Sequence, residues 1–279
     1  MLDRIKAAAP GICDLTQIGR SLKCVVFSGQ LGGRSVVAKV LDHRDPLWRW
    51  YFEREALVVP HLAAAPELVA NDQENGVLVF ASAVGKPLAR GRRLGREIDS
   101  RIIDAALAAS DSCAGVELPV EPPPEAVRAA MRSRLLEDPT AGIDWFVAGI
   151  DRCAGLGLVD SELAERMRAA LADYPELRCQ HGDLLPRNIA TCGDEILVFD
   201  WECAGDHARD WDRALLWAGL APYNRAHIER SLANAEPERI AGFRALCAFA
   251  LAREVKFARR GSPSRSRLER DLDAALARL

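Results

Sequence analysis

Residues 179–202 constrain the fold of this chain more than any other segment. Asp183 and Asn188 precede a short apolar run, residues 196–199, and Asp200 follows that run directly. Such a run is typical of a buried strand, so Asp200 is expected at a strand end and Asp183 on the preceding loop. A carboxylate on a loop can accept a hydroxyl proton, and carboxylate and amide oxygens are ligands that Mg²⁺ prefers. The segment therefore predicts a site where a magnesium nucleotide transfers a phosphoryl group.

The composition narrows the class of protein. A chain of 279 residues can form one large domain or two lobes, and 49% hydrophobic and 28% charged residues are typical of a soluble globular protein. A formal net charge of −3 argues against bulk binding of nucleic acid. Residues 1–6 lack the apolar stretch of a secretion signal and no run of 18 apolar residues occurs, so we expect a cytoplasmic protein without membrane contact. Eight cysteines without a CxxC pair favour reduced thiols over disulfides or a zinc site.

The N-terminal part of the chain predicts a sheet. Short apolar or β-branched segments alternate with glycine-containing turns, which predicts strands over residues 14–19, 24–29, 34–41 and 78–80. Gly32-Gly33 is typical of a hairpin tip. Asp45-Pro46 is typical of a helix start, and this helix should run toward Pro60.

Helical spacing of apolar residues takes over from about residue 97. We expect helices over residues 125–137, 142–155 and 160–173, and again after the motif segment. This order predicts an α+β fold of two lobes. Residues 1–82 would form an N-terminal, nucleotide-binding lobe with an antiparallel sheet and one helix. Residues 83–279 would form a mostly helical lobe that holds the catalytic loop and the acceptor site, with a cleft between the lobes.

Two motifs, His-Gly-Asp at 181–183 and Asp-Trp-Glu at 200–202, resemble those of the aminoglycoside phosphotransferase and choline kinase family, which are relatives of the protein kinases. The resemblance extends over approximately residues 15–215. It implies a two-lobed, protein-kinase-like fold that uses ATP and Mg²⁺. It also implies that Asp183 is the catalytic base and that Asn188 and Asp200 are the metal ligands.

Three neighbours of these residues have expected roles. By resemblance, His181 supports the catalytic loop by hydrogen bonding and Asp210 braces it. Arg187 departs from the family pattern, which often has a small residue before the asparagine. An arginine here either reaches the transferred phosphoryl group, pairs with Asp183 or is simply solvated, and we keep the contact as a hypothesis.

Lys39 lies within an apolar strand, on the same face as Val37. A lysine there needs a paired charge, unless it guards a sheet edge against aggregation. By resemblance, Lys39 holds the nucleotide phosphates and Val37 contacts the adenine. Glu53 and Glu55 are both available as its partner, and we favour Glu55 because it shares an apolar helix face.

The remaining nucleotide contacts are predicted from position. Gly19 and Ser21 stand where a phosphate loop is expected, although the G-x-G-x-x-G pattern of protein kinases is missing. After Phe80 the chain should form a hinge, where the backbone of Ala81 and Ala83 would hydrogen-bond the adenine.

The acceptor is the least constrained part of the prediction. Acidic residues outnumber basic ones over residues 179–240, and an acidic cleft wall that includes Glu202 and Asp206 would attract a cationic acceptor. Residues 253–270 are rich in arginine, however, and would disfavour a polyamine if they fold over the cleft. We expect a kinase for a hydroxyl of a small molecule, with an antibiotic (aminoglycoside-like, peptide or nucleoside) favoured over choline, homoserine or a sugar.

Two other classes remain open. The chain could be a non-catalytic nucleotide-binding module, although the joint presence of Lys39, Asp183, Asn188 and Asp200 argues against it. A two-metal phosphoesterase would need more histidines in ligand spacing than the chain offers near the motif.

Overall fold

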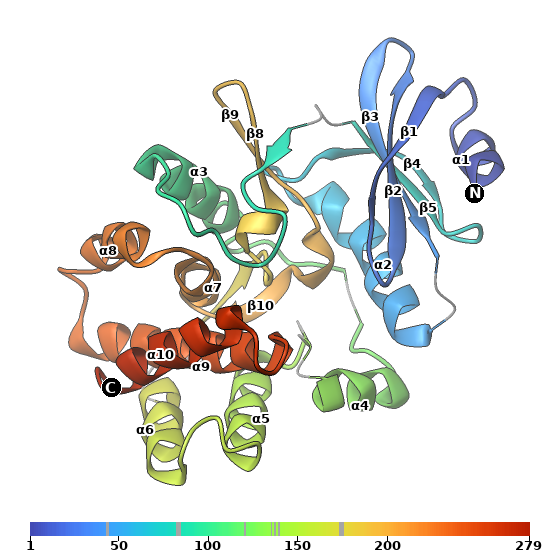
Figure 1. Cartoon of the computed structure of the whole chain (residues 1–279). Coiled ribbons are helices and arrows are strands. Elements are labelled where there is room, and N and C mark those ends of the chain that lie inside the picture. Colours follow the sequence, from blue (N-terminus) through green and yellow to red (C-terminus); the bar gives the residue numbers. More distant parts are fainter. Residues whose placement is uncertain are drawn as a thin grey trace.

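The computed structural model describes residues 1–42, 45–81, 85–119, 121–134, 136, 138, 140–172 and 176–279. Figure 1 shows two regions side by side, a sheet region of residues 1–81 and a mostly helical region of residues 85–279. The α+β class predicted from the sequence is confirmed. The expected lobe boundary between residues 82 and 83 lies outside the described residues.

The sheet region contains five antiparallel strands in the order β1-β2-β3-β5-β4. The strands are β1 (Cys13–Arg20), β2 (Cys24–Leu31), β3 (Arg34–Leu41), β4 (Glu67–Asp72) and β5 (Val77–Ala81). Gly32 and Gly33 join β2 to β3 with φ of 56° and 79°. Positive φ at both residues is what a tight two-residue hairpin requires, so the predicted hairpin tip is confirmed.

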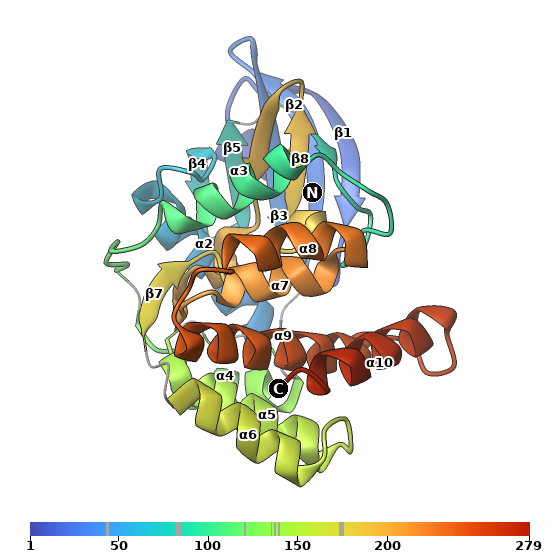
Figure 2. The same cartoon turned by 90° about the vertical axis from the view of Figure 1, so that its left-hand side faces the viewer.

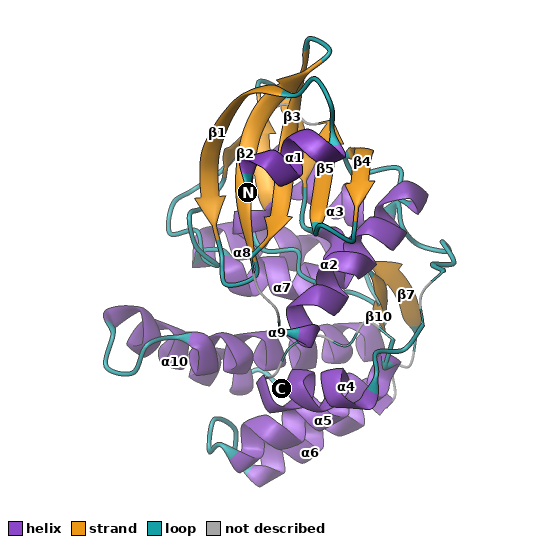
Figure 3. Ribbon diagram, turned by 90° about the vertical axis from the view of Figure 1, so that its right-hand side faces the viewer, coloured by secondary structure: helices purple, strands orange, loops and turns teal. Residues whose placement is uncertain are grey.

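Helices cover both faces of this sheet. Alternate residues of β3, among them Val36 and Ala38, pack under α1 (Leu2–Ala8), which lies against the sheet in Figure 3. The opposite face, with Lys39, turns toward α2 (Pro46–Val58), which a short helix η1 (Val59–His61) follows. The sequence predicted one helix here and no strand at β4. Helix α1 has one buried residue and β4 has none, so neither leaves a periodic apolar signal.

The helical region also holds two small sheets. Strands β6 (Lys86–Pro87), β8 (Ile189–Cys192) and β9 (Glu195–Val198) form one, and β7 (Leu177–Gln180) pairs with β10 (Gly205–Ala208) in the other. In the chain, the short helix η2 (Pro186–Asn188) precedes β8, and the short helix η3 (Trp201–Cys203) follows β9. The longer helices are α3 (Ser100–Asp111), α4 (Glu125–Arg134), α5 (Gly142–Gly155), α6 (Ser161–Ala172), α7 (Trp211–Gly219), α8 (Pro222–Ser231), α9 (Pro237–Phe257) and α10 (Pro263–Leu276).

Helix α9 forms the centre of this region. It packs against α5, α6, α7 and α10, and Figure 2 shows it between α7 and the α5–α6 pair. Residues 245–255 are all buried, which is typical of a helix enclosed on every side. Two charged residues, Arg253 and Glu254, are therefore held inside the fold by the helix that carries them. Within the described residues, no helix combines the length and the apolar character that crossing a bilayer requires.

Candidate active site

A lysine and two carboxylates join the two regions. Lys39 Nζ on β3 lies 2.6 Å from Glu55 Oε1 on α2 and 2.7 Å from Asp200 Oδ1, which follows β9. Burial opposes the charge on Lys39, but Asp200 and Glu55 outweigh it and raise the pKa of the ammonium group. The predicted pair of Lys39 with Glu55 is therefore present, and Glu53 instead pairs with Arg49 on the outside of α2.

The start of α2 determines which of its faces meets the sheet. Asp45 accepts a hydrogen bond from Leu47 N at 2.9 Å, and Pro46 occupies the first helical position. Phe52 and Ala56 then enter the main core. Glu55 is 2% exposed on that buried face, where its carboxylate is stabilised only because Lys39 pairs with it.

Asp183 lies on a loop that buried hydrogen bonds hold in place. Asp212 accepts hydrogen bonds from the backbone N–H of His181 at 2.7 Å and of Gly182 at 2.9 Å. Asp183 N–H donates to His181 Nδ1 at 3.2 Å, so the opposite ring nitrogen carries the proton and donates to the Phe199 carbonyl at 3.1 Å. These contacts confirm the supporting role predicted for His181.

The brace predicted for Asp210 belongs to Asp212 among the described contacts. Asp210 instead pairs with Arg239 at 2.8 Å and with Arg213 at 3.1 Å. Asp212 is 1% exposed and also accepts a hydrogen bond from the Ser110 hydroxyl on α3.

The two carboxylate oxygens of Asp183 meet different neighbours. Oδ2 accepts hydrogen bonds from Arg187 Nη2 at 2.8 Å and Asn188 Nδ2 at 3.1 Å. Oδ1 lies 3.4 Å from Arg253 Nη2 and 3.6 Å from Arg92 Nη2. Burial disfavours the charged form, but Arg187, Arg92 and Arg253 outweigh it and lower the pKa of Asp183 to about 2. The carboxylate is therefore ionised at neutral pH and can accept a hydrogen bond from a hydroxyl group.

Of the two predicted metal ligands, Asn188 contacts Asp183 directly, and Asp200 follows a residue that is hydrogen-bonded to Asn188. Asn188 Nδ2 donates to the Asp183 carbonyl at 2.8 Å, so the amide oxygen is the atom available to a cation. Phe199 N–H donates to the Asn188 carbonyl at 3.0 Å, which ties Asn188 to the residue before Asp200. Asp200 has a φ of 71°, a left-handed conformation that few residues other than glycine adopt. Such backbone strain is common where a side chain must be aimed at a functional site.

Lys23 is a further charged residue at this site, and no sequence pattern predicted a role for it. Its Nζ lies 3.1 Å from Asp200 Oδ1 and also pairs with Glu202. The turn between β1 and β2 carries Lys23, so this contact joins the expected phosphate loop to the helical region. Burial opposes the charge on Lys23, but Asp200 and Glu202 outweigh it and raise the pKa of its ammonium well above the usual value.

Glu202, a predicted acceptor ligand, lies beside Asp200 and Glu55. Oxygen atoms of Glu55, Asp200 and Glu202 lie within 4.8 Å of one another, an arrangement that could hold a metal ion. Burial and the charge of Asp200 raise the pKa of Glu202 to about 7, although Lys23 partly offsets them. Three carboxylates this close together repel one another, so a lysine ammonium group or a bound cation would stabilise them.

A cavity of about 310 Å³ opens next to these charged groups. It contains three of the predicted nucleotide contacts, Gly19, Ser21 and Val37, together with Lys39 and Asp200. Apolar side chains from both regions complete the wall, including Val26, Phe80, Ala190 and Leu197. The cavity thus combines apolar walls with two lysines, Lys23 and Lys39, which is a lining suited to a ligand with an apolar and an anionic part. Ala81 ends β5, and Ala83 lies outside the described residues.

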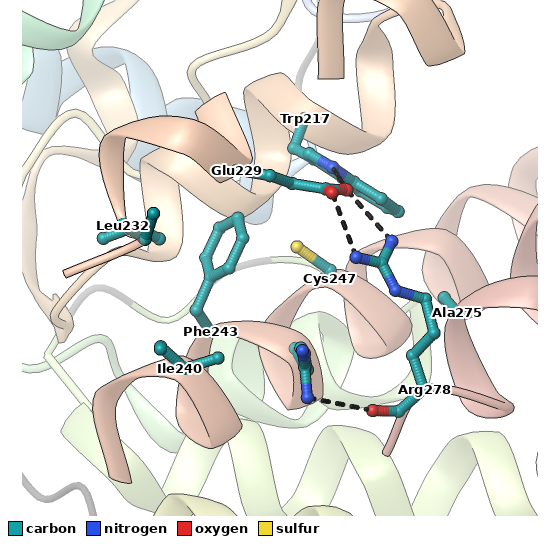
Figure 4. A pocket seen from close by; sticks show the side chains of 10 residues that line it. Trp217, Glu229, Leu232, Ile240, Phe243, Cys247, Ala275 and Arg278 are labelled. Carbon is teal, nitrogen blue, oxygen red and sulfur yellow. Dashed lines mark hydrogen bonds and ion pairs between the residues drawn. The ribbon is translucent and has the colours of Figure 1, made fainter. Parts of the chain in front are cut away.

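The predicted acidic wall is not assembled around Asp183 in the part of the chain that the structure describes. Asp206 is exposed on β10 and lines a separate hollow with Glu176 and Arg178. Glu229 accepts a hydrogen bond from Trp217 Nε1 at 2.9 Å and pairs with Arg278 at 3.0 Å. Figure 4 shows this pair at a cavity of about 320 Å³ between α7, α8, α9 and α10. The acidic residues that the sequence grouped are thus spread over several sites.

No protein-family model matches the sequence, and a search of curated proteins finds no match. Solved structures do match over the whole chain. An aminoglycoside phosphotransferase, APH(4)-Ia, in a ternary complex with ADP and hygromycin B, gives a TM-score of 0.60 at 16% identity, covering 99% of this chain and 97% of that chain. A choline/ethanolamine kinase family protein from Mesorhizobium loti gives 0.56 at 19% identity, covering 99% and 92%.

A macrolide 2'-phosphotransferase, MphH from Brachybacterium faecium, gives a TM-score of 0.55 at 17% identity, covering 99% of this chain and 96% of that chain. The chain therefore has the protein-kinase-like fold of the aminoglycoside phosphotransferases and choline kinases, as the resemblance implied. At these identities the likeness establishes the fold, and function must be argued from the site.

Proposed function

We propose that this protein is a phosphotransferase that moves the γ-phosphoryl group of ATP to a hydroxyl group of a small molecule. The observation that carries the proposal is a chain of contacts among three segments: Lys39 pairs with Asp200 at the wall of one cavity, the residue before Asp200 is hydrogen-bonded to Asn188, and Asn188 is hydrogen-bonded to Asp183. Phosphoryl transfer depends on positioning and on charge stabilisation, and this set supplies both. Named activities of the structural neighbours agree with this class.

In the proposed mechanism each residue has one task. Lys39, held by Glu55, positions the phosphates of the nucleotide, and Val37 contacts its base. Asp183 orients the acceptor hydroxyl and receives its proton as the bond to phosphorus forms. A pKa of about 2 makes Asp183 a weak base, which suits a loose transition state in which the proton leaves late. Arg187, whose Nη2 lies 2.8 Å from Asp183, is assigned to the transferred phosphoryl group.

The oxygen-rich donor set supports a magnesium site. Asn188 presents its amide oxygen, and Asp200 is a carboxylate at the edge of the cavity, which are the hard ligands Mg²⁺ takes together with phosphate oxygens and water. Bound Mg²⁺ would neutralise charge on the phosphates. Lys23 pairs with Asp200 in this structure. When Asp200 binds the metal, Lys23 must either move away or contact the same carboxylate together with the metal.

The proposal is tested by measuring ADP release with MgATP across hydroxyl-bearing acceptors, for the wild type and Asp183→Asn. We expect Asp183→Asn to lower kcat by about 100- to 10,000-fold, because removal of a general base has that effect. Affinity for ATP, measured by calorimetry, should persist. The matched control is Asp206→Asn, since Asp206 is exposed and lines a separate hollow.

Two results would count against the proposal in different ways. If Asp183→Asn keeps its turnover within about tenfold of wild type, the base assignment fails. If ATP binds but no acceptor stimulates ADP release, the protein is better described as a nucleotide-binding module with a kinase fold.

The physiological role proposed is inactivation of an antibiotic, and a metabolic kinase is the alternative. One structural neighbour was solved in complex with hygromycin B and another is a macrolide 2'-phosphotransferase, whereas a third belongs to the choline/ethanolamine kinase family. Expression in a susceptible bacterium separates the two roles. A rise in the inhibitory concentration of one antibiotic, abolished by Asp183→Asn, would support resistance.

A further inference from the structure

A separate cavity, of about 320 Å³, lies between α7, α8, α9 and α10 (Figure 4). The residues that line it are all different from those that line the 310 Å³ cavity at Lys39 and Asp200. Trp217, Leu232 and Phe243 are buried and give this second cavity an apolar wall. Its volume falls within the range of small-molecule sites, about 300–1,000 Å³. The proposed phosphoryl transfer uses none of its residues.

Glu229, the carboxylate in the wall of this cavity, is already neutralised. Its Oε1 accepts hydrogen bonds from Trp217 Nε1 at 2.9 Å and from Arg278 Nη1 at 3.0 Å. Its Oε2 accepts a third hydrogen bond from Arg278 Nη2, also at 3.0 Å. Figure 4 shows this two-pronged contact, which is the strong geometry of an arginine–carboxylate pair. Arg278 and Glu229 therefore satisfy each other, and neither charge is assigned to a ligand.

Arg244 is the other cation in the wall, and no carboxylate pairs with it among the described residues. Its Nη1 donates to the backbone carbonyl of Arg278 at 3.4 Å, which is longer than the usual hydrogen bond of about 2.9 Å. A guanidinium group carries five N–H donors, and Arg244 is exposed, so most of its donors can turn to a ligand. With Glu229 and Arg278 paired, Arg244 leaves the wall with one uncompensated positive charge.

The buried part of the wall carries no charge. Cys247 is 3% exposed and Ala275 is 7% exposed, and both line the cavity beside the aromatic rings. Burial raises the pKa of the Cys247 thiol well above its usual value, so the thiol stays neutral and packs as a small apolar group. The cavity thus offers an apolar interior and a single arginine at its exposed side.

We propose that this cavity is a second binding site, for a small amphipathic carboxylate, whose apolar body lies against Trp217 and Phe243 and whose carboxylate pairs with Arg244. A carboxylate matches one guanidinium group in charge and in geometry. A phosphate carries more charge than one arginine compensates. A polyhydroxylated or polycationic molecule would bury polar groups against an apolar wall, which is unfavourable.

Helix α7 belongs both to this cavity and to the support of the catalytic loop. Asp212 near its start accepts hydrogen bonds from the backbone of the loop, and Trp217 near its end lines the cavity. A ligand here would therefore contact the helix that holds the catalytic loop without entering the catalytic cavity. The inference does not depend on the proposed phosphotransferase activity.

The first test compares ligands that share a body and differ in charge, by calorimetry and thermal unfolding of the full chain. Suitable sets are phenylacetate, phenylacetamide, phenethylamine and phenyl phosphate; indole-3-acetate, indole-3-acetamide and tryptamine; and octanoate with octanamide. We expect the carboxylate of at least one set to bind most tightly and to raise Tm most, since a ligand of the folded state stabilises it. A tighter amide, amine or phosphate in every set would overturn the inference, as would the absence of saturable binding by any carboxylate at millimolar concentration.

The same titrations with and without MgADP separate the two cavities. Because the cavities share no lining residue, the Kd of the best carboxylate should stay within about twofold when MgADP is present. Loss of carboxylate binding in the presence of MgADP would place the ligand in the nucleotide cavity and overturn the inference. Failure of MgADP itself to bind would count against the proposed function alone.

The second test uses variants of exposed residues, which should fold as the wild type does. Arg244→Gln should raise the Kd of the best carboxylate by about tenfold, because a charge-assisted contact is lost, and Arg244→Lys should recover part of the loss. The Kd of the matching amide should stay within about twofold. Arg267→Gln is the matched control, since Arg267 is exposed on α10 and does not line the cavity. Equal losses in Arg244→Gln and Arg267→Gln would show that only the general charge of the surface matters and would overturn the assignment.

Ala233 allows the apolar part of the site to be tested by itself. It is exposed at the cavity wall, so Ala233→Trp should fill part of the space without disturbing the core. We expect it to weaken the carboxylate and the amide alike, by about tenfold or more, since both lose the same apolar contacts. Unchanged affinity for both ligands in Ala233→Trp would show that they bind outside this cavity.

Discussion

Lys39 Nζ and Asp200 Oδ1 lie 2.7 Å apart, although 161 positions separate the two residues in the chain. Lys39 comes from the sheet region and Asp200 from the helical region, so this ion pair forms only when both regions are in place. Glu55 on α2 completes the cluster at 2.6 Å from Lys39. The same contact that joins the regions also places the lysine and the carboxylate at the wall of the 310 Å³ cavity.

Removal of Lys39 should destabilise the fold. Lys39→Met leaves Glu55, whose side chain is 3% exposed, with a buried and uncompensated charge. We expect the free energy of unfolding to fall by about 3 kcal/mol, the loss typical of breaking a buried pair from one side. Urea denaturation measures it, and the double variant Lys39→Met/Glu55→Gln should recover part of the loss.

Arg49→Met serves as the control for that prediction. Arg49 pairs with Glu53 at 2.6 Å on the outside of the same helix, with side chains 50% and 36% exposed. Exposed pairs of this kind contribute less than about 1 kcal/mol. An equal loss in the two variants would show that the Lys39–Glu55 pair does not stabilise the protein through burial.

Lys23 should compete with a divalent cation. Its ammonium pairs with Asp200 and Glu202, which belong to the carboxylate cluster that could hold a metal. Lys23→Met removes one positive charge from that cluster, so we expect Mg²⁺ to bind about tenfold more tightly in the absence of nucleotide. Calorimetric titration with Mg²⁺ measures this change. Lys23→Arg keeps the charge and should bind Mg²⁺ as the wild type does; unchanged affinity in Lys23→Met would contradict the prediction.

Glu202 should give the stability of the protein a distinct pH dependence. Burial and Asp200 raise its pKa from 4.5 to about 7. Between these values the folded state binds a proton that the unfolded state has lost, so this contribution is present below pH 4.5 and declines as the pH rises to about 7. The expected slope is about 1.4 kcal/mol per pH unit, and Glu202→Gln should remove it from the free energy of unfolding measured by urea.

Glu229 provides a comparison of opposite sign. A hydrogen bond from Arg278 lowers the pKa of Glu229 below its usual value, against a smaller opposing effect of burial. Its contribution to stability is therefore present above the unfolded pKa and is lost as the pH falls. Glu229→Gln should lose stability mainly at neutral pH. If both variants shift stability in the same direction with pH, the assignment for Glu202 is wrong.

Gly182 should not tolerate a side chain. Its φ is 83°, and a Cβ would collide with the Cys203 carbonyl and lie 2.5 Å from His207 Nε2. We expect Gly182→Ala to lower the free energy of unfolding by at least about 2 kcal/mol, from backbone strain and overpacking together. Gly193→Ala is the matched control, because Gly193 has a φ of 60° and no atom within 4 Å of an added Cβ. The control should lose about 1 kcal/mol; similar losses would show that crowding at Gly182 is unimportant.

Local patterns predicted much of the site. Strand alternation placed Lys39 on the face that meets α2, and helical spacing selected Glu55 over Glu53. Both signals are local, because side-chain direction follows from the period of a strand or a helix. The class of the fold followed in the same way from the order of strand-like and helical segments. Helix α1 and strand β4 were missed because few of their residues are buried.

Contacts between distant segments could not be predicted from those patterns. Lys23 reaches Asp200 across the two regions, and Asp212 accepts hydrogen bonds from the backbone of the loop that carries Asp183. Arg253 lies within a helix that is buried on every side, so no apolar stripe indicates which of its residues faces Asp183.

The amino-acid sequence alone determined four strands of the large sheet, most helices, the paired Lys39 and Glu55, and the chemical character of Asp183, Asn188 and Asp200. The tertiary structure alone decided which charged side chains surround Asp183. The sequence had allowed either acidic or basic neighbours, and the structure places three arginines there. The physical reason is that periodicity is a property of neighbours in the chain. The electrostatic field at one carboxylate depends instead on charges that packing gathers from all parts of the molecule.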